Sequence, residues 1–256
     1  MAIRRYVRFK TKSGAAHGLL KGGVVYRIAG NLFGKHTVAT TGVKAEKLEL
    51  LAPVEPRKIF AVGLNYRSHL GDRPCPSIPE IFYKPVTAIQ DPGKPIVIPK
   101  EAVDVHAEGE LVVIIGKRTK HADREAAAKA IWGVSCGNDV SDRNWQRGAG
   151  KDLQWWRAKG CDTFAPLGPV AVRGADYENL LLTTRINGEV VQQQRTSDLI
   201  FDCATVVSFI SGFVTLEPGD LVYSGTPGST RKLNPGDRVE VEIESVGLLS
   251  NPVAAG

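Results

Sequence analysis

Residues 105–116 (Val-His-Ala-Glu-Gly-Glu-Leu-Val-Val-Ile-Ile-Gly) set two glutamates just before an apolar, β-branched run, which predicts a strand that enters a core. Side chains alternate faces along a strand, so Glu108 and Glu110 are expected on one face with His106 beside them. Two carboxylates there repel each other and lose hydration, and a hard divalent cation would relieve both costs. The alternative is a solvated strand end with two exposed glutamates.

A second buried strand is predicted over residues 131–141, and it ends in the polar, turn-forming sequence Asn-Asp-Val-Ser. Asp139 in this sequence is either a turn residue that accepts hydrogen bonds from nearby backbone N–H groups or a third metal ligand. Three carboxylates from two strands suit an octahedral Mg²⁺ or Mn²⁺ better than Zn²⁺, which favours His and Cys ligands.

Several further motifs follow one another in an order that is more specific than any one of them. They are Asn65-Tyr66-Arg67-Ser68-His69, Phe82-Tyr83-Lys84-Pro85, Asn138-Asp139-Val140-Ser141, Lys159-Gly160-Cys161-Asp162, Pro166-Leu167-Gly168-Pro169, Ile186-Asn187-Gly188, Gly225-Thr226-Pro227 and Pro235-Gly236-Asp237. Together with the Glu-x-Glu pair they make residues 57–253 resemble the fumarylacetoacetate hydrolase family. The resemblance implies a mixed β-roll, hence an α+β, mainly β fold, usually as a homodimer.

The resemblance implies a divalent metal held by Glu108, Glu110 and Asp139. Mg²⁺ or Mn²⁺ is the expected ion, with Ca²⁺ as a further candidate. It also implies that His69 and Asp72 form a general-base pair. In the family the partner three residues after the histidine is usually Glu, so the Asp found here is one methylene shorter.

The resemblance further implies that Lys159, Arg143 and Gln146 face the substrate, and that Thr226 contacts a substrate carboxylate or carbonyl. Each has an alternative: Lys159 and Arg143 as surface charges, Gln146 as a helix-surface residue, and Thr226 as a turn residue. The loop at residues 228–233 lacks the longer Gly-Val-Gly insert of many family members, which leaves the substrate class open.

The expected chemistry follows from these groups. A 2-oxo acid can chelate a divalent cation, which stabilises the enolate left when a bond beyond C3 breaks. Lys159 would add a second positive charge there. His69, oriented by Asp72, would take a proton from the attacking water. The first hypothesis is therefore a hydrolase that cleaves a C–C bond of an acylpyruvate-type 2,4-dioxo acid; the alternative is a decarboxylase, isomerase or hydratase of a related 2-oxo acid such as oxaloacetate.

The 256 residues allow one large domain with a small appendage. Residues 1–52 alternate short strands with Gly-rich turns and predict a small N-terminal domain, and residues 53–256 form the catalytic one. Helices are predicted over 122–131 and from Ser197 to Phe213, and a strand with one wet face over 239–244. No apolar run has a membrane-spanning length and no signal core follows the N-terminus, so a cytoplasmic protein without a membrane partner is expected.

The net charge of +6 and the pI near 9.1 raise the alternative of nucleic-acid binding. The densest basic stretch lies within residues 143–159 and is interleaved with tryptophans that could stack on bases. The same stretch could be a lid that presents cations to an anionic substrate. We favour the lid, because the stretch lies between Asp139 and Lys159, and expect a small 2-oxo acid rather than nucleic acid as the partner.

Overall fold

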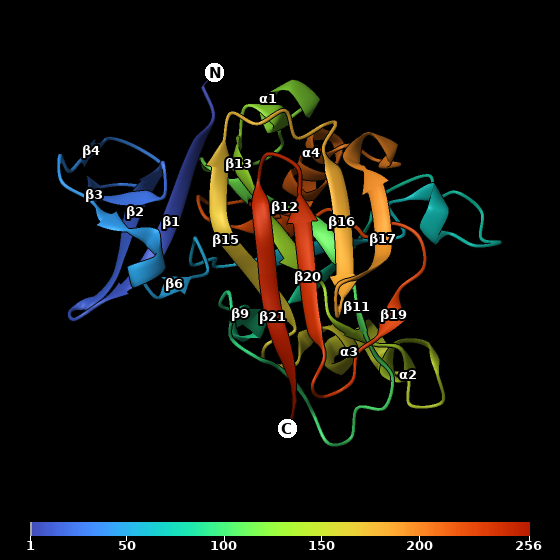
Figure 1. Cartoon of the computed structure of the whole chain (residues 1–256). Helices are drawn as coiled ribbons and strands as arrows, with labels where there is room; N and C mark the ends of the chain where they lie inside the picture. Colours follow the sequence, from blue (N-terminus) through green and yellow to red (C-terminus); the bar gives the residue numbers. More distant parts are fainter. Residues whose placement is uncertain (1) are drawn as a thin grey trace.

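The structure is a computed structural model that describes residues 2–256, and strands make up most of its regular elements, which confirms the predicted α+β, mainly β class. The N-terminal strands are β1 (Arg4–Thr11), β2 (Gly14–Lys21), β3 (Val24–Gly30), β4 (His36–Val38), β5 (Val43–Lys44) and β6 (Leu50–Leu51). Strands β1, β2 and β3 pair antiparallel as a ribbon on the left of Figure 1.

This ribbon continues into the sheet of the remaining chain. The strands that continue it are, in spatial order, β15 (Ala165–Arg173), β13 (Ile131–Asn138), β12 (Gly109–Ile115), β18 (Leu221–Tyr223), β7 (Ile59–Gly63) and β8 (Glu80–Lys84), with β9 (Ile89–Gln90) beside β15. The junction is the antiparallel pairing of β1 with β15. The expected boundary between residues 52 and 53 therefore divides one continuous sheet, and the division into two domains stays a prediction.

A second sheet stands in front of β12 and β13 in Figure 1. Its strands are, in spatial order, β10 (Ile96–Ile98), β21 (Gly247–Ala255), β20 (Arg238–Ile243), β16 (Leu181–Ile186) and β17 (Glu189–Arg195). The valines and the isoleucine of β20 are buried while its charged residues are not, as predicted for residues 239–244. A small sheet joins β14 (Ser141–Asp142), β11 (Val105–Ala107) and β19 (Arg231–Lys232).

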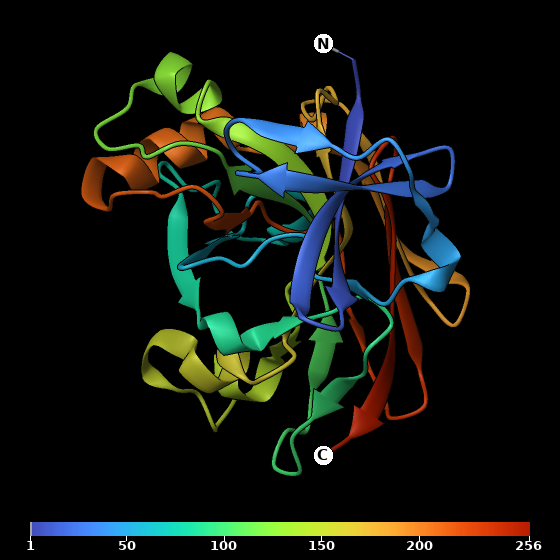
Figure 2. The ribbon, with the colours of Figure 1, turned by 90° about the vertical axis from the view of Figure 1, so that its left-hand side faces the viewer.

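The α-helices lie at two opposite ends of the molecule (Figures 1 and 2). At one end are α1 (Arg124–Ala128) and α4 (Cys203–Phe213), and at the other are α2 (Arg143–Arg147) and α3 (Trp156–Gly160). Single 3₁₀ turns occur at Ala45–Lys47, Arg67–His69, Val86–Ala88, Leu153–Trp155 and Thr196–Asp198. Within residues 2–256, every helix is too short or too polar to cross a membrane.

Two helix boundaries differ from the sequence prediction. The helix expected from Ser197 begins only at Cys203, because Asp202 is its N-cap and accepts a hydrogen bond from the Thr205 N–H at 2.7 Å. Asp202 therefore starts the helix, and Ser197 and Asp198 belong to the 3₁₀ turn before it. Helix α1 likewise covers only the middle of the predicted segment 122–131, despite its good helix formers.

Strand β12 is buried on both faces, which explains why its sequence is a continuous apolar run. Leu111 and Val113 belong to a hydrophobic cluster that includes residues of α4 and β20. Val112 and Ile114 belong to a second cluster, which includes Tyr6 of β1. The strand that carries Glu110 is thus fixed by packing from both sides.

Gly109 allows the second sheet to approach β12 closely. A Cβ atom at this position would lie 2.0 Å from the Oγ1 atom of Thr184 on β16 and 3.3 Å from its Cβ atom. A larger residue at 109 would push β12 and β16 apart, and it would do so between Glu108 and Glu110.

We expect Gly109→Ala to destabilise the protein by roughly 1–3 kcal/mol, because the added methyl group overpacks the contact with β16. Urea unfolding followed by circular dichroism measures this loss. The double variant Gly109→Ala/Thr184→Ala removes the hydroxyl in the way and should regain part of the stability. Strictly additive effects of the two substitutions would contradict a direct contact as the cause.

Candidate active site

Three carboxylates meet where β12 begins and β13 ends. Glu108 occupies the break between β11 and β12, so the single strand predicted over residues 105–116 is in fact divided at this residue. The Asp139 N–H donates to the Glu108 carbonyl at 2.9 Å, which holds the two residues side by side. One carboxylate oxygen each from Glu108, Glu110 and Asp139 lies within 4.8 Å of the others. Their exposed fractions of 4%, 1% and 1% exclude the solvated strand end considered above.

Two of the three carboxylates are paired with buried cations. The Lys159 ammonium donates to Glu108 at 2.7 Å and to Asp139, which also pairs with Lys84, and the Arg143 guanidinium pairs with Glu108. Burial opposes ionisation of Glu108, but Arg143 and Lys159 outweigh it and hold its pKa well below the usual range. Burial likewise opposes the charge of Lys159, yet Asp139 and Glu108 raise its pKa.

Glu110 is the carboxylate without a cationic side-chain partner within residues 2–256. Its carboxylate accepts one hydrogen bond, from the Gly225 N–H at 2.7 Å. Burial, followed by the charges of Asp139 and Glu108, raises its pKa well above the usual range. A buried, cation-poor carboxylate among oxygen donors fits a hard divalent cation such as Mg²⁺ or Mn²⁺, which the three residues would hold.

The Gly-Thr-Pro turn is fastened to β12 by side-chain hydrogen bonds. The Thr226 hydroxyl donates to the Gly109 carbonyl at 2.9 Å and accepts from the Gln192 amide at 2.8 Å. Gln192 lies on β17 and also donates to the Pro227 carbonyl at 2.6 Å. On the other side, the Asn65 amide donates to the Ser224 carbonyl at 2.7 Å.

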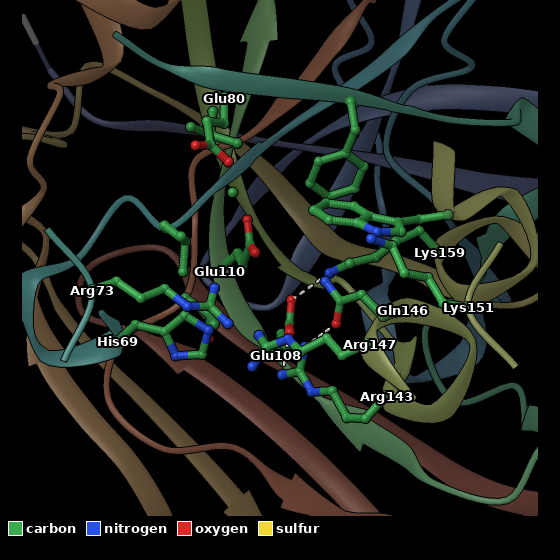
Figure 3. A pocket seen from close by; sticks show the side chains of 16 residues that line it. His69, Arg73, Glu80, Glu108, Glu110, Arg143, Gln146, Arg147, Lys151 and Lys159 are labelled. Atoms are coloured by element: carbon green, nitrogen blue, oxygen red, sulfur yellow. Dashed lines mark hydrogen bonds and ion pairs between the residues drawn. The ribbon is translucent and has the colours of Figure 1, made fainter. Parts of the chain in front are cut away.

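Helix α2 presents Arg143 and Gln146 to the same cavity as Glu108 and Glu110 (Figure 3). Asp142 caps this helix by accepting from the Trp145 N–H at 2.8 Å. The Arg143 guanidinium donates to Gln146 Oε1 at 2.7 Å, so the two side chains act as one unit. The cavity measures about 310 Å³ and is lined by Val62, Gly63, Leu64, His69, Arg73, Glu80, Phe82, Glu108, Glu110, Arg143, Gln146, Arg147, Lys151, Trp155, Lys159 and Thr226.

The structure does not join His69 to Asp72. The His69 imidazole lines the cavity, and its Nδ1 atom contacts the Gly228 carbonyl instead. Asp72 is exposed, and within residues 2–256 neither a hydrogen bond nor an ion pair links it to His69. Burial first, then the charges of Arg143 and Arg147, lower the pKa of His69. The general-base pair stays a prediction and would require Asp72 to move.

The basic stretch between Asp139 and Lys159 faces the cavity or is internally paired. Arg147 and Lys151 line the cavity beside the carboxylates. The Arg157 guanidinium bonds to Asp152 and lies 4.7 Å from the centre of the Trp145 ring. This placement agrees with the lid interpretation, and the absence of nucleic-acid binding stays a prediction.

Sequence reasoning missed several residues around the carboxylates. Lys84 is buried and paired with Asp139, and its only signal was its place in the Phe-Tyr-Lys-Pro motif. Gln192 fixes Thr226 from a distant strand, and no sequence pattern marks it. Arg73 and Glu80 line the cavity from segments to which no role was given.

Comparison with known families agrees with this geometry. Residues 58–254 match the family described as fumarylacetoacetate (FAA) hydrolase C-terminal, and residues 4–53 match the one described as Rv2993c-like, N-terminal. The chain therefore belongs to the fumarylacetoacetate hydrolase family, as its motifs indicate.

Individual relatives extend over most of the chain. It is 43% identical over 232 residues to protein Rv2993c of Mycobacterium tuberculosis, covering 88% of this chain and 86% of that protein. It is 41% identical over 220 residues to a mitochondrial protein of Bos taurus named oxaloacetate tautomerase FAHD2A, covering 81% and 70%. A crystal structure titled 5-carboxymethyl-2-hydroxymuconate delta-isomerase, from Mycobacterium smegmatis, superposes with a TM-score of 0.91 at 39% identity, covering 98% of this chain and 100% of that chain.

We expect Glu110→Gln to raise the melting temperature of metal-free protein, at roughly 2–4 °C per kcal/mol of repulsion relieved. The folded-state pKa of Glu110 lies above its unfolded value, so its ionised form destabilises the fold. The difference from wild type should therefore be absent at low pH and widen as the pH rises through that folded-state pKa. Thermal scans at several pH values measure it.

The same scans with added Mn²⁺ test the metal site. Mn²⁺ should raise the melting temperature of wild type and of Glu80→Gln, which changes a carboxylate of the same cavity outside the triad. Mn²⁺ should leave the melting temperature of Glu110→Gln unchanged. An equal Mn²⁺-induced rise in all three proteins would contradict the assignment of Glu110 as a ligand.

Proposed function

We propose that this protein is a divalent-metal-dependent enzyme that acts on 2-oxo acids, with cleavage of a C–C bond in an acylpyruvate as its reaction. The observation that carries the proposal is the buried triad of carboxylates, of which Glu108 and Glu110 open onto the same cavity as Lys159 and Arg143. Oxygen ligands with nearby cations suit an anionic, oxygen-rich substrate. A homodimer in the cytoplasm is the expected setting.

The cavity residues have separate tasks in this proposal. A bound Mg²⁺ or Mn²⁺ would polarise the carboxylate and keto oxygens of the substrate as a Lewis acid. Negative charge develops on the keto oxygen as the bond at C3 breaks, and the Lys159 ammonium stabilises it. Arg143 and Gln146, joined by their hydrogen bond, orient the substrate carboxylate, and Thr226 is placed to contact its carbonyl.

Hydrolysis also needs a base for the attacking water. His69 serves this role, because its lowered pKa keeps the imidazole neutral at pH 7 and able to accept a proton. The water oxygen bonds to the distal carbonyl carbon while the bond from that carbon to C3 breaks. The acyl group leaves with the water oxygen as a carboxylic acid, and the electron pair of the broken bond forms the enolate of the shorter 2-oxo acid. Protonation of this enolate at C3 gives the 2-oxo acid.

Keto–enol tautomerisation or isomerisation of a related 2-oxo acid such as oxaloacetate is the second candidate reaction, and decarboxylation or hydration would start from the same groups. The separation of His69 from Asp72 favours it, because the water-activating pair is incomplete while the cations around the carboxylates are in place. Similarity to proteins named oxaloacetate tautomerase and hydroxymuconate isomerase gives further support. Tautomerisation requires no attacking water.

A substrate panel with EDTA-stripped protein tests the proposal. The panel holds acetylpyruvate, fumarylpyruvate and oxaloacetate, and the readouts are loss of enol absorbance and release of pyruvate. Turnover should rise at least about 100-fold when Mg²⁺ or Mn²⁺ is restored, because the metal supplies several kcal/mol of charge stabilisation. Loss of enol absorbance without pyruvate would select the tautomerase, and equal turnover with and without metal would contradict the proposed metal dependence.

Substitution of His69 separates the two reactions. We expect His69→Ala to lower hydrolysis of acylpyruvates by about 10²–10⁴-fold, as for loss of a general base. Proton exchange at C3 of oxaloacetate in D₂O, followed by NMR, should change far less. For the wild type, kcat/KM for hydrolysis should rise with pH through an acid limb below pH 6.5, because the pKa of His69 is lowered.

Asp72→Asn is the matched control for this experiment. Asp72 does not contact His69 in the structure. Asp72→Asn should therefore change the rate of hydrolysis by less than about threefold, as expected for substitution of an exposed residue. A loss as large as that of His69→Ala would show that the two residues pair during the reaction.

A further inference from the structure

One histidine that the sequence places beside the two glutamates takes no part in the proposed reaction. His106 is the middle residue of β11, which lies between β14 and β19 in the small three-stranded sheet. Its backbone pairs with Ser141 on one side and with Lys232 on the other. This register brings His106 to the point where β14 leads into Arg143 and where Thr230 leads into β19.

The side chains at this point form a continuous chain of hydrogen bonds. The Arg143 guanidinium donates from Nη2 to the Thr230 hydroxyl oxygen at 2.8 Å. The Thr230 hydroxyl lies 2.9 Å from Nδ1 of His106, and Nε2 of the same ring lies 3.1 Å from the Asp104 carboxylate. The Asp104 carbonyl accepts the backbone N–H of Arg143 at 2.9 Å, so the chain of bonds returns to the residue from which it starts.

The chemistry of these groups gives the chain one direction. A carboxylate can only accept, so the contact with Asp104 requires the proton on Nε2 of His106. In the neutral ring Nδ1 is then an acceptor, and it takes the hydrogen of the Thr230 hydroxyl. The lone pairs of the Thr230 oxygen are left for the Arg143 guanidinium. We call the three residues Asp104, His106 and Thr230 the relay.

The relay acts on the same nitrogen of Arg143 that pairs with a carboxylate of the triad. Nη2 pairs with Glu108 as well as with Thr230, and Nη1 donates to Gln146 at 2.7 Å. Figure 3 shows the guanidinium beside Glu108 and Gln146. Thr230 is a third, uncharged partner that fixes the plane of the guanidinium without changing the charge of the site. The side chains of Arg143 and His106 are only 11% and 17% exposed, so water competes little with these bonds.

We propose that Thr230 and His106 are positioning residues, which hold the Arg143 guanidinium in the orientation that binds the substrate carboxylate. The inference rests on the proposed function and deepens it. Neither residue lines the cavity that contains Glu108 and Glu110, so both act through Arg143. A guanidinium that is fixed before the substrate arrives loses less conformational entropy on binding. Loss of the relay should therefore weaken substrate binding and raise KM, with little change in kcat.

A purely structural role is the competing explanation, because the relay also joins segments at the edges of the small sheet. In that case substitution of Thr230 or His106 would lower the stability of the protein, and any loss of substrate binding would be independent of Arg143. Positioning predicts a different result. The loss of binding should disappear once Arg143 is removed, because two residues that act through one contact are not additive.

Side-chain NMR of Arg143 tests the positioning without any substrate. In the Mg²⁺-loaded protein we expect separate signals for the Nη1 and Nη2 groups, because the bonds to Gln146 and Thr230 restrict rotation of the guanidinium. Thr230→Val keeps the shape of the side chain and removes the hydroxyl, so rotation should become at least about tenfold faster. Thr230→Ser should keep the slow rotation. Arg143→Met identifies the signals.

Calorimetry with pyruvate and the Mn²⁺-loaded protein measures the consequence for binding. We expect Thr230→Val and His106→Leu to weaken pyruvate binding by about 5- to 30-fold. Thr230→Ser should restore it, as should His106→Asn, whose amide oxygen can replace Nδ1 as the acceptor. In an Arg143→Met background, Thr230→Val should change the affinity by less than about twofold. The matched control is Ser229→Ala, which removes the exposed neighbouring hydroxyl and should bind pyruvate like the wild type.

Any of three results would overturn the inference: unchanged rotation of Arg143 in Thr230→Val, unchanged pyruvate affinity in that variant, or an equal loss of affinity with and without Arg143. Melting temperatures and Mn²⁺ affinities like those of the wild type show that the variants are folded and that the triad is intact. If His106→Leu is unstable, Thr230→Val decides alone. Failure of the wild type to bind pyruvate would contradict the proposed function, whereas the NMR signals of Arg143 would still show whether Thr230 positions it.

Discussion

Burial of three carboxylates at one point is the constraint on which the rest of the site depends. Ion pairs with Lys84, Lys159 and Arg143 offset the charges of Glu108 and Asp139, but no cationic side chain within residues 2–256 bonds to Glu110. Such a cluster is costly in a dry interior unless a cation completes it. Burial and two acidic neighbours raise the pKa of Glu110, so a divalent cation held by the three residues would stabilise its ionised form.

Distant parts of the chain must meet for this cluster to form. The register of β12 with β13 brings Asp139 to Glu108, helix α3 delivers Lys159, and the second sheet contributes Gln192, which holds Thr226 against β12. Gly109 serves both fold and site, because a side chain there would separate the two sheets between Glu108 and Glu110. The glycine between the two glutamates is thus a packing requirement as well as part of the candidate metal site.

Local signals in the sequence predicted the parts that depend on neighbours along the chain. Three such patterns were visible: the apolar run after Glu110, the alternation in β20 and the polar end of β13. The first and the last of them predicted the two strands that carry the three acidic residues, which do lie together in the structure. The start of α4 was misplaced because the cap, Asp202, resembles a polar interruption within the helix. Gln192 and Arg73 could not be found, since their roles depend on contacts between distant elements.

The short loop after Thr226 sets the environment of His69, because its Gly228 carbonyl contacts the imidazole. A carbonyl oxygen can only accept, so the contact with Gly228 requires the proton on Nδ1 of His69 and leaves Nε2 free to act as the base. A carboxylate in that position would stabilise the imidazolium with a full negative charge, whereas the Gly228 carbonyl orients the ring and raises the pKa of His69 less than burial lowers it. The loop at residues 228–230 therefore fixes the tautomer while the pKa of His69 stays low. This favours a base that is neutral at pH 7 and accepts a proton only briefly, which suits proton transfer at C3 at least as well as the activation of water.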